Sequence, residues 1–434
     1  MRPDDDHSPV SSKCERKSGL IAWAFYDWAN SAFFTLIQTF VFATYFVRMV
    51  AENETIGTAL WGYLTAATGL IIALGGPVLG AMADQGGRRK PWIAAFTLLS
   101  VIATAGLWFV APTSGYVYLA LVLVGLGTLG AEFANIFYNA MLPSLASPDR
   151  IGRWSGWGWG FGYAGGLFCL AVALLGFVGD QNAWFDLDRE ASEHVRATFF
   201  LTAVWMLVFS VPLLLMTPDT PSTGKTFSQS VVDGLRQLLD SARHVRRYRY
   251  IVRFLIAWMF YTNGLLTLFM FGGVYAAGTF DMSEADVLKL GITLNLAAGL
   301  GAALFAWVDD WIGAKATIML SLVGLIVPGT LILLVHSPAA FWSLGIVIGA
   351  FVGPAQAASR SYLARAAPEA LRTEMFGLYA LSGKATAFLG PLLVGWLTHL
   401  TGSQRVGMAP IVVFLAIGLL IMFAVPPPRR AQRL

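Results

Sequence analysis

Charged residues, cysteines and clustered histidines are all scarce in this sequence of 434 residues. Only 12% of the residues are Asp, Glu, Lys or Arg, whereas soluble domains have about 25%, which excludes an ordinary water-soluble domain. The two cysteines, Cys14 and Cys169, cannot build a disulfide framework. No histidine and cysteine cluster and no nucleophile with an adjacent base is evident. We therefore expect no metal, no cofactor and no enzyme activity.

Hydrophobic residues make up 56% of the sequence and gather in long apolar runs. Runs of about 20 residues can cross a hydrocarbon core about 30 Å thick, and in lipid they satisfy their backbone groups as helices. The sequence therefore predicts an all-α integral membrane protein with twelve transmembrane helices. The expected spans lie near 20–50, 58–83, 92–111, 116–141, 154–178, 197–216, 251–278, 287–309, 316–335, 340–364, 373–398 and 407–425.

Lysine and arginine are distributed unevenly among the loops. Most of the 29 Lys and Arg residues fall in segments that are cytoplasmic if both termini are inside, and cytoplasmic loops carry this excess. We therefore expect both termini to be cytoplasmic. The net charge of +4 then reflects orientation in the lipid bilayer, and no nucleic-acid partner is expected. Short loops and the lack of a targeting signal favour a prokaryotic inner (plasma) membrane.

The loop between the second and third spans has an acidic residue, glycines and a basic cluster in close succession. It runs from Gly80 to Lys90, and a degraded copy from Asp310 to Lys315 follows the eighth span. Glycines let backbones approach and turn sharply, and an aspartate can accept hydrogen bonds at a helix N-terminus. The motif predicts a gate, with simple anchoring at the inner surface as the alternative for the basic residues. The predicted gating residues are Gly80, Asp84, Gly87, Arg88, Arg89, Asp310, Gly313 and Lys315.

The two halves of the sequence are related as repeats. Several landmarks recur with one offset of 221 residues: Asn135, Asn139, Gly156 and Gly162 map onto Gln356, Arg360, Gly377 and Gly383. Six-span repeats place a transport site between the halves, and this pattern with its loop motif resembles the major facilitator superfamily, although Gln85 replaces a usual basic residue. The expected organisation is an N-terminal cytoplasmic tail (1–19), a six-helix bundle (20–216), a cytoplasmic linker (217–250), a second six-helix bundle (251–425) and a cytoplasmic tail (426–434).

The linker between the halves begins with helix-breaking residues, among them Pro218 and Gly224. Val231, Leu235 and Leu239 then recur at helical spacing, next to several arginines. This pattern predicts an amphipathic helix on the anionic inner leaflet. A linker whose charges only enforce topology is the alternative.

Three further stretches carry a narrower resemblance. The first span contains AFYDWANSAF (24–33), the fourth ends in YNAMLP (138–143), and spans 10 and 11 contain QAASRS (356–361), FGLY (376–379) and SGKA (382–385). Together they resemble the vacuole-effluxer (UMF1-type) family of the major facilitator superfamily, which includes the autophagy-linked amino-acid exporter of the fungal vacuole. The resemblance implies transport by alternating access, amino acids as the best-known cargo, and a monomer.

Polar side chains inside the expected spans are few and share helix faces. Asp27 and Asn30 lie on one face of the first span, and Glu132, Asn135 and Asn139 on one face of the fourth. A charge in hydrocarbon is costly and normally faces a cavity, so we expect such residues to bind a small-molecule substrate. The predicted substrate-binding residues are Asp27, Asn30, Glu132, Asn135, Asn139, Asn263, Gln356, Arg360 and Lys384.

The charges in this set nearly cancel, because it contains two acids, Asp27 and Glu132, and two cations, Arg360 and Lys384. They could bind a zwitterion, with Arg360 on its carboxylate, form salt bridges that break and re-form during transport, or act as permanent structural locks. Asp27 and Glu132 are also the candidates for proton coupling, because a low dielectric favours a neutral acid. Members of the family usually carry an acidic residue at the position of Asn263, so here the other two carboxylates must carry any proton.

These observations predict a secondary active transporter of a small polar solute. An amino acid or short peptide is the first expectation, and a proton-coupled carrier of another small metabolite is the second. A lipid or drug carrier would need an overwhelmingly apolar cavity. A receptor or scaffold without transport activity would keep the fold but should lose the charges of the cavity.

Overall fold

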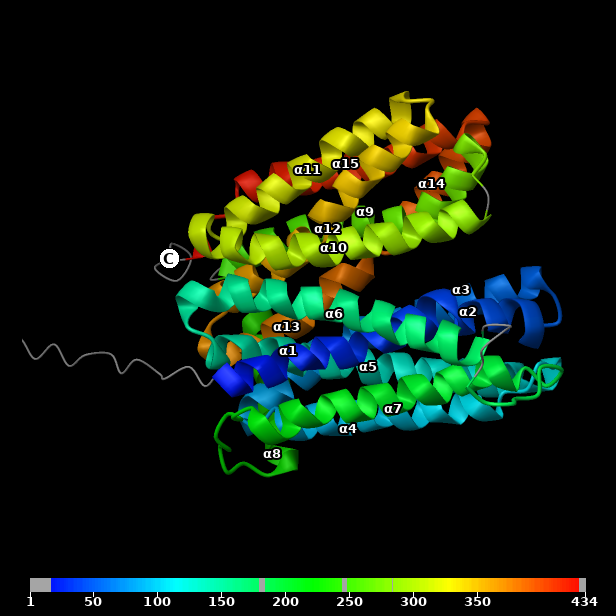
Figure 1. Ribbon diagram of the computed structural model, residues 1–434. Helices are drawn as coiled ribbons and strands as arrows, with labels where there is room; N and C mark the ends of the chain where they lie inside the picture. The colour runs from blue at the N-terminus through cyan, green and yellow to red at the C-terminus, as the bar shows by residue number, and fades with distance from the viewer. Residues whose placement is uncertain (1–16, 179–183, 244–247, 283, 429–434) are drawn as a thin grey trace, which may run out of the picture.

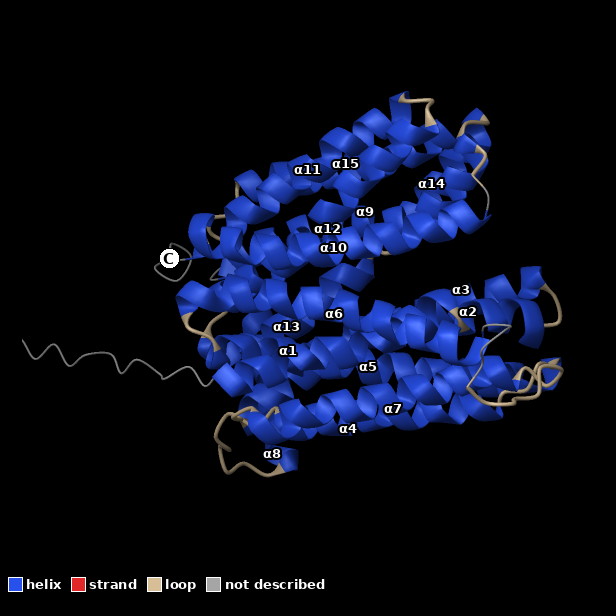
Figure 2. Cartoon of the chain, viewed as in Figure 1, coloured by secondary structure: helices blue, strands red, loops and turns tan. Residues whose placement is uncertain are grey.

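The computed structural model describes residues 17–178, 184–243, 248–282 and 284–428, and every regular element within them is helical (Figure 2). Twelve helices in these residues are long and apolar enough to cross a membrane, which confirms the predicted all-α membrane fold. Their ends differ from the predicted span edges by six residues at most, the largest difference lying at Pro148. Residues 1–16, which include Cys14, and residues 429–434 lie outside the described part.

The first half of the chain packs as one bundle of six spans (Figure 1). The first span is continuous through α1 (Lys17–Ala32), the π-helical η1 (Phe33–Phe40), α2 (Phe42–Tyr45) and the π-helical η2 (Phe46–Val50). The other five are α3 (Glu54–Gly86), α4 (Lys90–Gly106) with η3 (Leu107–Phe109), α5 (Val117–Leu145) after η4 (Ser114–Tyr116), α6 (Ile151–Ala173) between η5 (Pro148–Arg150) and η6 (Leu174–Val178), and α7 (Glu193–Met216).

The second half forms the other bundle, in which one span is broken. Its helices are α9 (Arg249–Phe280), α10 (Glu284–Ile312), α11 (Ala314–Leu334), α12 (Pro338–Ala366), η8 (Glu369–Leu371), α13 (Arg372–Ala385), α14 (Leu389–Thr401) and α15 (Gln404–Phe423). The eleventh span consists of α13 and α14 with three turn residues between them. Residues 386–388 therefore interrupt the helix inside the membrane.

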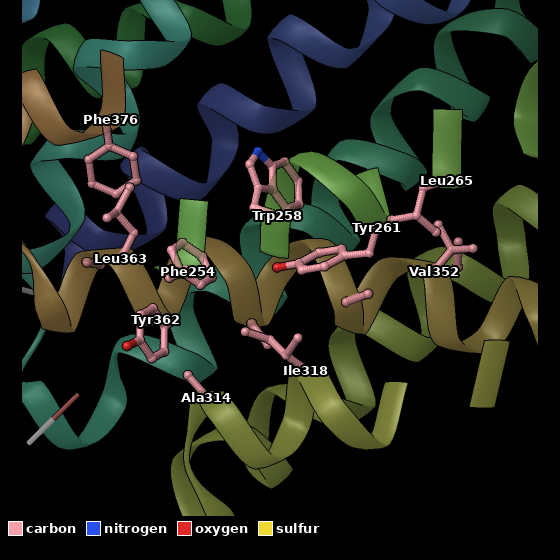
Figure 3. Close-up of a cluster of buried hydrophobic side chains, with 14 of the residues drawn as sticks. Phe254, Trp258, Tyr261, Leu265, Ala314, Ile318, Val352, Tyr362, Leu363 and Phe376 are labelled. Atoms are coloured by element: carbon pink, nitrogen blue, oxygen red, sulfur yellow. The ribbon is translucent and has the colours of Figure 1, made fainter. Parts of the chain in front are cut away.

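Aromatic and aliphatic side chains pack together in a buried cluster of the second bundle (Figure 3). Phe254 on α9 stacks on Tyr362 of α12 with ring centroids 4.4 Å apart. The hydroxyl groups of Tyr261 and Ser359 lie 2.6 Å apart, which joins the same two helices. All four side chains are buried, and this packing fixes the position of α12, which carries Arg360 next to Ser359.

The two bundles contact one another through α3 with α13 and through α6 with α10 and α12. Small residues allow a close approach: a Cβ on Gly377 would collide with the backbone of Gly76, and one on Gly156 with the carbonyl of Ala302. The bundles meet at the end where both ends of the described chain and α8 lie, and they diverge toward the other end (Figure 1). We call these the termini end and the far end.

The glycines of α3 that contact α13 lie in the half of α3 nearer the termini end. A Cβ on Gly80 or Gly76 would meet α13, whereas one on Gly69 or Gly62 would have no described atom within 4 Å. The glycines farther along α3 therefore do not bring it against the second bundle. The molecule is closed between the bundles at the termini end.

The linker contains the expected helix, α8 (Phe227–Arg243), which packs on the end of α3. A Cβ on its Gly234 would collide with the backbone of Ala81 and Met82. Val232, Leu235 and Leu239 lie on its exposed side. The helix therefore presents a small-residue face to the first bundle and an apolar stripe away from it.

Candidate functional site

An ion pair joins the two bundles where α1, α5 and α12 meet. Arg360 Nη1 donates hydrogen bonds to Asp27 Oδ2 over 2.9 Å and to Asn139 Oδ1 over 3.2 Å. The hydroxyl of Tyr138 donates to the same Asp27 oxygen over 2.9 Å. The side chains of Asp27 and Arg360 are only 13% and 4% exposed. The structure thus brings three predicted substrate-binding residues into one desolvated cluster, and it adds Tyr138, which the sequence analysis did not single out.

The other nitrogens of the Arg360 guanidinium also donate hydrogen bonds within the protein. Its Nε donates to Ser155 Oγ over 2.9 Å and its Nη2 to the Ser155 carbonyl over 2.6 Å. The cation lies 5.0 Å from the ring centroid of Trp23 and 5.7 Å from that of Trp159, distances at which cation–π attraction operates. A solute carboxylate would have to displace a partner to reach Arg360. This geometry is that of a lock between the bundles.

A second ion pair between the bundles is more open. Lys384 Nζ on α13 donates to Glu132 Oε1 on α5 over 2.7 Å. The two side chains are 33% and 17% exposed, so solvent or a solute can reach them. Of the two charged pairs, this one is therefore placed to exchange its internal partner for a ligand.

Two predicted asparagines hold unused acceptors. The side-chain oxygens of Asn30 and Asn135 are buried and have no hydrogen-bond partner among the described residues. Leaving a buried acceptor unsatisfied costs about 1–3 kcal/mol, so these oxygens are suited to a ligand donor. The predicted Gln356 is engaged, because its Oε1 accepts a hydrogen bond of 2.8 Å from Tyr163 on α6.

Asn263 makes its hydrogen bonds away from the charged cluster. Its amide nitrogen donates to the carbonyl of Thr386, and its amide oxygen accepts from the backbone amide of Gly390 over 3.2 Å. The residue is 1% exposed. The structure therefore places this predicted substrate-binding residue against the break in the eleventh span.

Asp84, the first aspartate with a predicted gating role, caps a helix of the opposite bundle. Its Oδ2 accepts hydrogen bonds from the backbone amides of Thr373 over 2.8 Å and Glu374 over 3.0 Å, at the start of α13. Its Oδ1 accepts from the Thr373 hydroxyl and, over 3.3 Å, from Arg89 Nη2. Unpaired amides and the helix dipole both favour an anion at this position. We call this set of contacts the Asp84 junction.

Asp310, the second aspartate with a predicted gating role, occupies the equivalent place between α10 and α6. Its carboxylate lies beside the backbone amides of Gly152 and Arg153 at the start of α6. Its Oδ1 accepts from Arg365 Nη2 over 2.9 Å, and its Oδ2 is 3.4 Å from Arg153 Nε. We call this set the Asp310 junction. It depends on arginine side chains more than the Asp84 junction does.

The sequence analysis missed two members of the Asp310 junction, Asp309 and Arg365. Arg365 Nη1 donates to Asp309 Oδ1 over 2.5 Å, and the Ser361 hydroxyl donates to the same oxygen over 3.1 Å. One arginine therefore holds two adjacent carboxylates. The signal that could have revealed it is the Asp309–Asp310 pair at the end of an apolar span, which requires a cation nearby.

The remaining predicted gating residues differ in their placement. Gly87 and Gly313 both have positive φ, +85° and +88°, which glycine adopts without strain. Arg88 is exposed. Lys315 Nζ donates to the carbonyl of Phe423 over 3.2 Å, within its own bundle. The structure thus brings Arg89, but neither Arg88 nor Lys315, to the contact between the bundles.

The linker takes part in the Asp84 junction. Gln237 on α8 donates to Glu374 Oε2 over 2.7 Å and accepts a hydrogen bond from Gln85, so it connects α13 to α3. Asp219 accepts from the two backbone amides at the start of α4, over 2.9 and 3.2 Å. On the exposed side, a hydrogen bond from Lys225 lowers the pKa of the Asp233 carboxyl. The linker is therefore packed against the loop between α3 and α4.

The fold is that of solved transporters of the major facilitator superfamily. The proton:xylose symporter XylE aligns with a TM-score of 0.73 and 16% identity, covering 95% of this chain and 96% of that one. FucP in the outward conformation aligns with a TM-score of 0.72 and 12% identity, covering 95% and 99%. Twelve membrane helices in two bundles, with charged pairs between them, give the chain the fold of this superfamily.

Within that superfamily the chain belongs to the family described as vacuole effluxer Atg22 like, whose model matches residues 51–153 and 149–433. It is 27% identical to the uncharacterized MFS-type transporter YxiO of Bacillus subtilis, over 93% of this chain and 94% of the relative. It is 24% identical to autophagy-related protein 22-1 of Phaeosphaeria nodorum, over 84% and 75%. The predicted family is therefore confirmed.

Proposed function

We propose that this transporter moves a small solute carrying both a positive and a negative charge, an amino acid or a short peptide. The observation that carries the proposal is the Glu132–Lys384 pair, in which each bundle supplies one charge and both side chains are partly exposed. A zwitterion matches this arrangement, because its ammonium can take the place of Lys384 on Glu132 while its carboxylate takes the place of Glu132 on Lys384. The unused oxygens of Asn30 and Asn135 offer further acceptors.

The Asp27–Arg360 pair has a different role in this proposal. Its members are more buried and have more internal partners than the Glu132–Lys384 pair. Removing one partner of a buried pair costs about 3–5 kcal/mol, which makes it suited to holding the bundles together until a solute arrives. We assign it to the lock between the bundles and the open pair to solute recognition.

The direction of opening follows from the loop charges. If both termini are cytoplasmic, closure at the termini end makes this the outward-facing state, and solute reaches the site from the far end. Release on the cytoplasmic side then requires the Asp84 and Asp310 junctions to open. The bacterial relative favours the inner membrane of a prokaryote as the location.

Proton coupling is the second candidate, and the two ion pairs give it a mechanism. When the bundles separate, the carboxylates of Asp27 and Glu132 lose the cations that balance them. An unbalanced carboxylate in a low dielectric is favoured as the neutral acid, so movement of the bundles would take up protons. A proton-driven carrier of another small metabolite would use the same step.

The test is uptake of a mixed, labelled amino-acid pool by proteoliposomes, with and without a pH gradient. Glu132→Gln and Lys384→Ala should each reduce saturable uptake by more than about tenfold, because a charge-assisted hydrogen bond contributes about 1.5–3 kcal/mol. Lys289→Ala is the matched control, since Lys289 pairs with Asp286 on its own helix and is 68% exposed. Uptake that is absent for every amino acid, or that survives both substitutions, would contradict the proposal.

The gradient arm separates the two candidates. Uptake that depends on the gradient in the wild type and loses that dependence in Asp27→Asn or Glu132→Gln assigns the proton to that carboxylate. Uptake that ignores the gradient in all variants rejects proton coupling and leaves amino-acid transport standing.

A further inference from the structure

The break in the eleventh span has a specific hydrogen-bond pattern. Pro391 has no backbone N–H, so the carbonyl of Ala387 lacks its usual helical donor. The preceding helical pair would be the Gly390 amide and the Thr386 carbonyl, but these two groups do not bond to one another. The Thr386 carbonyl accepts instead from the Leu389 amide, over 2.9 Å in a tight turn. Proline accounts for the first loss directly, and its ring also disfavours helical geometry in the turn before it.

The side chain of Asn263 lies between the two separated backbone groups. Its amide nitrogen donates to the Thr386 carbonyl, while its amide oxygen accepts from the Gly390 amide over 3.2 Å. Thr267 Oγ1 packs against it and donates to the Asn263 carbonyl over 2.7 Å. One asparagine thus satisfies both members of an interrupted helical pair, and a Cβ on Gly390 would collide with the Thr267 hydroxyl.

The open charged pair lies next to the break. Lys384 is in the last turn of α13, two residues before Thr386, and its Nζ donates to Glu132 over 2.7 Å. Carbonyls left unpaired at a helix C-terminus also favour a cation there. The contact between bundles and the break are therefore coupled.

We infer that Asn263 is the positioning residue of the solute site: it holds the eleventh span broken so that Lys384 faces Glu132 and the solute. The inference rests on the proposed function for the role of that pair. Its chemical requirement is stringent, because the side chain must donate one hydrogen bond and accept another at the same time. An amide and a neutral carboxylic acid both meet it, whereas a carboxylate can only accept.

Asn263→Asp tests this requirement directly, because protonation restores or removes the donor without changing the size of the side chain. A cysteine at Ala385, which is exposed beside the break, reports local structure by its reaction with a thiol reagent once Cys14 and Cys169 are replaced by serine. The same reporter with Asn263 intact corrects for ionisation of the thiol. We expect the corrected reactivity of the Asp variant to rise at least about fivefold between pH 5 and pH 8, as the acid loses its proton.

Transport gives a second readout. In proteoliposomes supplied with the amino-acid pool, Asn263→Asp should carry solute at about pH 5 and lose more than about tenfold of that activity by pH 8, relative to wild type. Asn263→Ala should be inactive at both values. Asn295→Asp is the matched control, because Asn295 donates to the carbonyl of Gly291 within its own helix, over 2.8 Å, and its pH profile should follow the wild type.

The two readouts fail independently. Absence of amino-acid flux in the wild type would reject the proposed solute while the cysteine reporter still tests the break. A corrected reporter profile in Asn263→Asp that matches the wild type from pH 5 to pH 8 would overturn the inference. A variant that elutes as an unfolded aggregate on size-exclusion chromatography at about pH 5, where the neutral acid should replace the amide, would also overturn it.

Discussion

The Asp84 and Asp310 junctions share one plan but are closed by different chemistry. In each, an aspartate at the end of one span faces the start of a helix in the other bundle. The facing residues, Thr373 and Gly152, are again 221 positions apart, so the repeat relates the two junctions. Asp84 is held mainly by backbone amides and a hydroxyl, whereas Asp310 shares Arg365 with its neighbour Asp309.

This difference shows how a duplicated gate can acquire unequal halves. Backbone amides at a helix start are fixed by the fold and survive substitution of any one side chain. An arginine shared by two carboxylates is more vulnerable, because its loss removes the cation next to Asp309 and leaves Asp310 with Arg153 alone. Within the described part of the linker, Gln237 connects α8 to the Asp84 junction. The following matched substitutions test the comparison.

The largest effect is expected for Arg365→Gln, with Arg89→Gln as its counterpart. Loss of Arg365 removes the shared cation of Asp309 and Asp310, which are 3% and 9% exposed, and an unbalanced buried charge costs about 3–5 kcal/mol. Arg89→Gln leaves Asp84 its amide donors, so about 1–2 kcal/mol is expected. Thermal unfolding in detergent should show the larger loss of Tm for Arg365→Gln. Equal losses would contradict the comparison.

The second effect concerns the aspartates themselves. Asp84→Asn turns one acceptor oxygen into a donor that faces donors, and it should weaken the Asp84 junction by about 2–3 kcal/mol. Asp310→Asn leaves Arg365 paired with Asp309 and should cost about 1 kcal/mol, because one hydrogen bond to Arg365 is weakened. Labelling of a cysteine at the buried Ala83 measures opening, and its rate should rise more than about tenfold in the first variant only. A faster rate in Asp310→Asn would reverse the assignment.

The third effect separates two glycines that have the same backbone angle. Gly87→Ala and Gly313→Ala both place a side chain at positive φ, which costs about 1 kcal/mol. At Gly87 the new Cβ would also collide with the carbonyl of Pro221 in the linker, whereas at Gly313 it meets no described atom within 4 Å. Gly87→Ala should therefore lower Tm more. The comparison fails if the two variants unfold together.

The smallest effects are expected in the linker. Gln237→Ala removes the connection between Gln85 and Glu374 and should cost about 1 kcal/mol. Arg236→Ala removes a pair with Asp233 whose members are 75% and 35% exposed, and such surface pairs contribute about 0–1 kcal/mol. Labelling at Ala83 should be faster in Gln237→Ala and unchanged in Arg236→Ala. An unchanged rate in both would remove the linker from the gate.

The sequence was sufficient for the spans and the family, because length, hydropathy and short motifs are properties of single segments. It also singled out Asp84 and Asp310, whose gating role stays a prediction. It could not identify the partners of Asp84, since these are backbone amides of α13, which every residue type except proline carries. Arg365 was missed because its repeat counterpart is Ser144, so the repeat gives no hint of it. The role of Asn263 depends on two backbone groups more than 120 positions away, which no local pattern encodes.

The account's central claim is that the Asp84 and Asp310 junctions together hold the termini end closed. The most direct test is the distance distribution between spin labels at the exposed positions Arg88 and Glu369, in protein whose two native cysteines are replaced and which is reconstituted in lipid. Wild type should give one short distance, and Asp84→Asn combined with Arg365→Gln should move most of the population to a longer one. A distribution that the double substitution leaves unchanged would contradict the claim.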